Sequence, residues 1–235
     1  MEGKQIERPF ERVKHDSLVY LIEFVENTAS IIGCDSIKDE ILIPYSISIK
    51  EKEFIITSIS EKAFNFSQAK SIIIPNYSEI HVIAKKAFFK SSIETFAVTQ
   101  HLTHIEESAF AHCLQLRTVN IPNNSELQMI GKYAFSHSSI ESFTVPTHLT
   151  YINEGIFEHC SQLRTINISL NSKLQTIDKY AFSYSSIESF TIPSGLIDLK
   201  EGWCHETEKL INIKVSSQNQ RYIGWPLSNR NFYEY

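Results

Sequence analysis

Hydrophobic positions along most of the chain follow one short pattern that returns every 23 or 24 residues. It reads apolar-x-x-apolar-x-apolar, as in IETFAV from Ile93 and LRTVNI from Leu116. The clear copies begin at Ala69, Ile93, Leu116, Ile140, Leu163, Ile187 and Leu210. The last part of each copy alternates apolar and polar positions, which is typical of a short half-buried strand. The pattern therefore predicts one such strand in each repeating unit.

A second marker, an Ala-Phe pair or a close variant, predicts a turn before each strand. Its aromatic position is occupied by Phe64, Phe88, Phe110, Phe135, Phe157 and Phe182, and Cys204 takes the next place. After Phe88 the spacing alternates between 22 and 25 residues, so two units make a period of 47 residues. The stretches KYAFSHSSIESFTVP at 132–146 and KYAFSYSSIESFTIP at 179–193 are identical at 13 of 15 positions.

A third marker, apolar-x-x-Ile, follows the strand, as in LTHI from Leu102 and LQTI from Leu174. Each unit thus holds a strand, a turn, a second apolar segment and an Ala-Phe turn. One unit cannot bury its apolar side alone, so stacked units are expected to share a continuous core. A further strand is expected in EILIPYS at 40–46, and the long gap after it predicts an inserted turn or hairpin near SIKEKEF at 48–54.

The strand pattern, in units of this length, resembles the leucine-rich repeat. Stretches such as NIPNNSELQMIGKYAF and SAFAHCLQL resemble its BspA-like subfamily, in which a strand ending in Ile-Pro precedes an Ile, an Ala-Phe pair and often a Cys. The Ile-, Asn- and Tyr-rich composition is more similar to the trichomonad-type protist branch. The resemblance implies a right-handed solenoid of about eight rungs. One parallel sheet would line one face, with short extended or 3-10 segments opposite.

Three parts of the chain are expected. Residues 1–30 would form an N-terminal cap, residues 31–215 the BspA-like leucine-rich-repeat solenoid, and residues 216–235 a C-terminal cap or the start of a continuation. Both tryptophans fall near the end, in GWCHE at 202–206 and YIGWPL at 222–227. We expect them to cover the end of the core in preference to forming an exposed binding pair.

Charge and apolar content exclude several classes of protein. A net charge of −5 and a pI near 6.0 argue against a broad nucleic-acid surface, which needs clustered Lys and Arg. No apolar run reaches the roughly 18 residues that a membrane-spanning helix needs. The charged start MEGKQIERPFERVKHD does not resemble a secretory signal. The 4 cysteines are too few and too scattered for a disulfide scaffold.

His-Cys pairs at His112–Cys113 and His159–Cys160 suggest a zinc site, but their spacing argues against one. They lie two units apart, which places equivalent atoms roughly 10 Å apart in a stacked sheet. That is too far for one metal ion or for a disulfide. We therefore expect each Cys to fill a buried slot as a small hydrophobe. The sequence predicts no metal, no cofactor and no catalytic residue, and hence no enzyme.

The outward positions of the strands form the candidate binding surface. One row alternates in charge along the stack, with Arg117 and Arg164 between glutamates. Because unlike charges on neighbouring strands stabilise a sheet, we interpret this alternation as a stacking device. The candidate ligand-binding residues on this sheet face are Glu94, Thr95, Arg117, Thr118, Asn120, Glu141, Ser142, Thr144, Arg164, Thr165, Asn167, Glu188, Ser189 and Thr191.

The resemblance implies a surface adhesion or antigen protein that binds host or microbial macromolecules. The partner would be a protein or a glycan, host extracellular matrix included, with no nucleic acid and no membrane-spanning segment. The resemblance favours the cell surface or secretion, while the start of the chain carries no recognisable signal peptide. The alternative is a cytoplasmic leucine-rich-repeat scaffold for protein–protein interaction.

Overall fold

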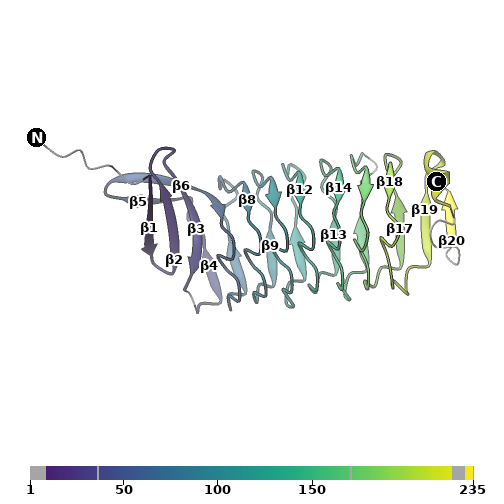
Figure 1. The fold of residues 1–235 in the computed structure, drawn as a ribbon, viewed down its shortest axis with the longest axis horizontal. Helices are drawn as coiled ribbons and strands as arrows, with labels where there is room; N and C mark the ends of the chain where they lie inside the picture. The colour runs from purple at the N-terminus through teal and green to yellow at the C-terminus, as the bar shows by residue number, and fades with distance from the viewer. Residues whose placement is uncertain (1–8, 36, 170, 224–230, 235) are drawn as a thin grey trace, which may run out of the picture.

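The computed structural model describes residues 9–35, 37–169, 171–223 and 231–234 of the chain. The molecule is a long rod with β1 near one end and β20 at the other, and the repeating units follow one another in chain order between them (Figure 1). Nearly all of its regular structure is strand. Among the described residues, no helix has the length and apolar character needed to cross a membrane.

The strands expected from the hydrophobic pattern form the first face of the rod. Neighbours pair in parallel, as Ser71 does with Thr95, and Thr95 with Thr118. The pairing is interrupted after β11 and after β15, so the face consists of three successive parallel sheets where one was expected. The first face comprises β4 (Glu40–Leu42), β7 (Ser71–Ile73), β9 (Thr95–Ala97), β11 (Thr118–Asn120), β13 (Ser142–Thr144), β15 (Thr165–Asn167), β17 (Ser189–Ile192) and β19 (Asn212–Val215). Each of these strands belongs to one turn of the chain, and the stacked turns confirm the predicted leucine-rich-repeat solenoid of about eight rungs.

Two-residue parallel strands also run along the opposite face, in two ladders separated between β12 and β14. His104 in the third marker, for example, pairs with Val82 on one side and Met129 on the other. The second face comprises β8 (Val82–Ile83), β10 (His104–Ile105), β12 (Met129–Ile130), β14 (Tyr151–Ile152), β16 (Thr176–Ile177) and β18 (Asp198–Leu199). The expected extended segments are thus confirmed and are themselves paired. In the described part of the chain, 3-10 structure is limited to η1 (Ser217–Tyr222).

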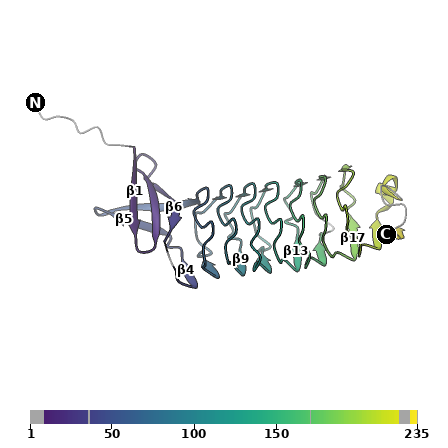
Figure 2. The ribbon, with the colours of Figure 1, turned by 60° about the horizontal axis from the view of Figure 1, so that its bottom comes forward.

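The N-terminal strands extend only the second face. β1 (Phe10–His15), β2 (Leu18–Glu23) and β3 (Thr28–Cys34) pair antiparallel, and β3 then pairs in parallel with β6 (Lys52–Ile59), which continues to β8. β5 (Ser46–Ile49) folds back antiparallel on β6, which confirms the predicted hairpin. β4 therefore stands at the end of the first face, whose row of strands follows the lower side of Figure 2.

At the other end, backbone pairing continues the first face. β20 (Asn231–Glu234) pairs in parallel with β19. Trp203 is fully buried and packs against Phe182 and Phe190, with ring centroids 6.0 and 4.8 Å away. It therefore belongs to the buried core of the last rung and is not an exposed binding residue, while Trp225 lies outside the described residues.

Aromatic rings form a continuous stack through the core. Neighbouring phenylalanines of the Ala-Phe turns lie 4.8–5.7 Å apart between ring centroids, and all are buried. The middle inward position of the first-face strands packs against this stack: Phe96 lies 4.7 Å from Phe110, and Phe143 lies 4.8 Å from Phe157. That position alternates between Phe and a β-branched residue, in the order Phe96, Val119, Phe143, Ile166, Phe190 and Ile213.

Each Ala-Phe turn also places residues in the left-handed backbone region. Tyr133 and His137 have φ of 55° and 57°, and Gly155 has the equivalent conformation one rung later, with φ of 59°. A Cβ atom at Gly155 would lie 2.2 Å from the ring of Tyr133, so glycine leaves space there for that ring. Large and small residues thus alternate at this position too.

Candidate functional site

The predicted binding residues all lie on the outer surface of the first face. Thirteen of the 14 are exposed, and Thr191 is half-buried. Main-chain bonds link neighbouring rungs: the amide of Arg117 donates to the carbonyl of Glu94 at 2.9 Å, and that of Arg164 donates to Glu141 at 2.9 Å. The residues therefore form rows along the rod, one rung after another.

The alternating charges lie on neighbouring rungs but do not form close ion pairs. Among the described residues, no guanidinium nitrogen of Arg117 or Arg164 comes within 4.0 Å of a carboxylate. Lys70, at the start of the row, bonds Asp39 at 2.7 Å, and this bond raises the pKa of its ammonium. Attraction between these charges therefore acts over longer distances, where solvent and salt screen it more strongly. The heads of these side chains remain available to a partner.

A groove of about 350 Å³ at the ends of β7, β9 and β11 adds residues that the strand pattern did not select. Four amide side chains line it, those of Asn76, Gln100, Asn120 and Asn124. The Nδ2 of Asn124 donates to the Oε1 of Gln100 at 3.0 Å. Of these four residues, Asn120 lies on a strand and the other three lie in the turns after the strands. The turns therefore enlarge the candidate surface with neutral donors and acceptors.

The cysteines of the two His-Cys pairs are buried and hydrogen-bonded to the main chain. The Sγ of Cys113 donates to the carbonyl of Phe88 at 3.0 Å, and that of Cys160 donates to Phe135 at 3.1 Å. Burial raises the pKa of both thiols to about 11. Both thiols are thus buried as expected, but they also act as weak donors. No set of three or more possible metal ligands occurs among the described residues.

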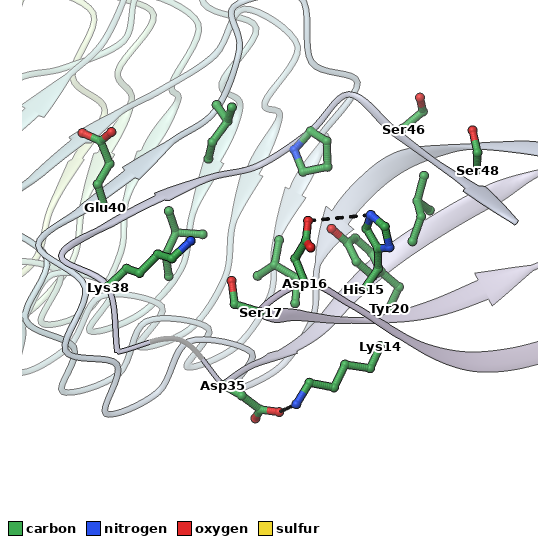
Figure 3. A pocket seen from close by; sticks show the side chains of 15 residues that line it. Lys14, His15, Asp16, Ser17, Tyr20, Asp35, Lys38, Glu40, Ser46 and Ser48 are labelled. Atoms are coloured by element: carbon green, nitrogen blue, oxygen red, sulfur yellow. Dashed lines mark hydrogen bonds and ion pairs between the residues drawn. The ribbon is translucent and has the colours of Figure 1, made fainter.

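A cavity lies between the N-terminal strands and the start of the first face. This cavity of about 880 Å³ is walled by β1, β2, β4 and β5 (Figure 3). Lys14 and Asp35 form an ion pair of 2.7 Å at its rim. Burial raises the pKa of Tyr20 to about 12, and the charge of Asp16 adds to the shift. The repeat pattern does not point to this cavity, because β1 and β2, which form one of its walls, lie before the repeat.

Comparison with protein families settles what the repeats are. Six copies of the BspA type leucine rich repeat region match the chain, over residues 44–164 and 128–227. The chain belongs to the BspA-type leucine-rich-repeat family. The matched ranges include the strands β6 to β19 and most of the candidate face. No curated protein sequence matches significantly.

Several solved structures are similar in fold. The pneumococcal vaccine antigen PcpA is 15% identical, with 88% of this chain and 82% of that chain covered and a TM-score of 0.44. A leucine rich cell surface protein from Faecalibacterium prausnitzii is 14% identical, with 96% and 94% covered and a TM-score of 0.30. The T. pallidum leucine rich repeat protein is 13% identical, with 95% and 81% covered and a TM-score of 0.44. Likeness at this level carries no conclusion about a ligand.

Proposed function

We propose that this BspA-type protein is a non-enzymatic recognition module that binds a protein or glycan partner on its first face. The observation that carries the proposal is the continuous outer surface of this face. Charged and hydroxyl side chains lie on successive rungs, and within the described part of the chain neither Arg117 nor Arg164 forms a close ion pair. Stacked parallel strands offer an extended surface suited to a large ligand.

We further propose that the protein acts at the cell surface as an adhesion or antigen protein, and that host extracellular matrix is among its partners. The support is the family and the likeness to a vaccine antigen and to a cell surface protein. The composition supports a place in the protist branch. Labelling of intact cells with an impermeant reagent tests the location. Labelling only after lysis would favour the cytoplasmic scaffold instead.

Binding is tested with immobilised matrix proteins and host-cell extracts. A variant with both Arg117→Glu and Arg164→Glu is expected to lose at least tenfold in affinity, because two cations at the centre of the face become anions. The control variant, Lys62→Glu with Lys86→Glu, makes the same change in net charge within the Ala-Phe turns. Equal affinities of the two variants for a captured partner would move the binding site away from the first face.

A further inference from the structure

The two faces of the rod are covered differently at the N-terminal end. The second face continues from β8 through β6 into β3, β2 and β1, so its strands are followed by further strands. Among the described residues, the first face stops at β4, which pairs there with β7 alone. An uncovered strand at the end of a sheet offers main-chain donors and acceptors to another chain.

Main-chain geometry identifies the groups that β4 leaves unpaired. Its pairing with β7 uses the carbonyl of Asp39, which accepts from Ser71 at 3.0 Å, and the amide of Ile43, which donates to Ile73 at 2.9 Å. Because main-chain groups of successive strand residues point to opposite sides, those of Glu40 and Leu42 point away from β7. Within the described residues no hydrogen bond to the main chain of either residue is present.

The cavity of about 880 Å³ lies beside this edge. Buried apolar side chains of Leu18, Ile41 and Ile47 line it, while Leu42 is 63% exposed on the outer side of β4. Figure 3 shows Lys38 and Glu40 on one side of the cavity and His15, Asp16 and Tyr20 on the other. Successive side chains of an added strand would point alternately toward the cavity, beside Ile41, and toward the outer side, beside Leu42. Apolar side chains of this chain are thus present on both sides.

We propose that the edge of β4 binds an extended peptide segment of a partner protein as an added strand. The unpaired groups alternate between N–H and C=O along the edge, and a second main chain is the ligand that supplies the same alternation. The rim carries Lys14 and Lys38 together with Asp16, Asp35 and Glu40, so it does not select a strongly charged ligand. The segment would be uncharged or nearly so, with apolar side chains at alternate positions. This site is separate from the outer surface of the first face.

A synthetic peptide of residues 186–194, SIESFTIPS, is the probe, because in the rod this sequence forms a strand that pairs in parallel with its neighbour. Binding is measured by amide hydrogen exchange of the whole protein with the peptide at about 1 mM, a concentration that detects even weak complexes. The amide of Leu42 is expected to exchange at least tenfold more slowly. The same peptide with N-methyl groups at alternate amides keeps its side chains and is expected to give no protection.

Two variants separate strand addition from other binding. Leu42→Pro removes the outward N–H without touching the bonds to β7, since proline is tolerated at sheet edges. It should abolish peptide binding, which is followed in this variant by exchange of the outward amide of Glu40. Leu42→Thr keeps the N–H and should bind within about threefold of the unmodified chain. Unchanged exchange at Leu42 with peptide, or equal protection by the N-methylated peptide, overturns the proposal. Protection that rises with protein concentration alone would assign the edge to a second copy and also overturn it.

Discussion

His137 shows how strongly one side chain depends on equivalent residues of neighbouring rungs. Its ring stacks between those of His112 and His159, with centroids 4.3 and 4.5 Å away. Burial lowers the pKa of His137, and the neighbouring His159 lowers it further, while Glu158 opposes the shift. Burial also lowers the pKa of His112, and the nearby His137 and Lys90 add to this effect. The folded protein therefore favours the neutral imidazoles.

The stack predicts a loss of stability in acid. A pKa lowered by folding means that the unfolded chain binds protons more readily, so this stability is present above the ordinary histidine pKa of about 6.5 and is lost as pH falls below it. Replacing His137 with Tyr, the residue at the equivalent Tyr184, should reduce the fall in melting temperature between about pH 8 and about pH 5 by a few degrees.

The control for this experiment is His148→Tyr, which removes an exposed histidine outside the stack. Its melting temperature is expected to depend on pH as that of the unmodified chain does. Identical pH profiles for His137→Tyr and the unmodified chain would show that the stacked rings have ordinary proton affinity. Scanning calorimetry at several pH values measures all three proteins.

The strands and turns explain why the repeat spans two rungs. Phe and β-branched residues alternate at the middle inward position, and Tyr133 lies over Gly155 as a large residue over a small one. Close-packed interiors accept large side chains when smaller ones face them. The alternation of charge on the outer surface has the same period but no close ion pair. Size alternation in the core and turns is therefore the stronger physical reason for the period of 47 residues.

Breaking the alternation in the core should be costly. Val119→Phe would put three phenylalanines in a row with Phe96 and Phe143, and overpacking of this kind costs about 1–3 kcal/mol. Val119→Ile is the matched control, because Ile166 occupies the same position two rungs later, and its effect should stay below about 1.5 kcal/mol. Urea denaturation measures both free energies of unfolding. A larger loss for Val119→Ile than for Val119→Phe would contradict this explanation of the period.

The sequence predicts the repeating elements well because each is fixed by local contacts that recur. The inward positions of β9 to β19 follow directly from the hydrophobic pattern, and the outer residues follow from them. The histidine stack is harder to predict from the sequence. His112 and His159 each precede a Cys, whereas His137, on the rung between them, precedes a Ser, so the three do not share one motif. The cavity beside β4 depends on β1 and β2, which lie outside the repeat, so pattern alone does not bring its walls together.

At the scale of the whole molecule, the stability of each rung depends on its contacts with the two neighbouring rungs. Each ring of the Ala-Phe stack contacts the ring before it and the ring after it, so the rod behaves as a chain of nearest neighbours. The N-terminal strands extend the second face at one end, and β20 extends the first face at the other. Damage in the middle of the rod is therefore expected to separate it into two parts with different stabilities.

Phe135→Ala tests this expectation, because Phe135 is fully buried near the middle of the stack. The cavity should cost about 3–5 kcal/mol. Hydrogen exchange should then show β11 and β13 opening before β7 and β17. Phe135→Leu refills most of the space and serves as control, with a smaller cost. Uniform loss of protection along the whole rod in Phe135→Ala would show instead that the solenoid unfolds as a single cooperative unit.

The shared period of the alternations determines how such a chain can change its length. Insertion or removal of 47 residues keeps every large side chain beside a small one and every Arg of the outer row beside a Glu. Insertion of one rung places two phenylalanines, or two like charges, next to each other. The two-rung segment is thus the natural module of growth by duplication. The near-identity of residues 132–146 and 179–193 is what one recent copy of that module would leave behind.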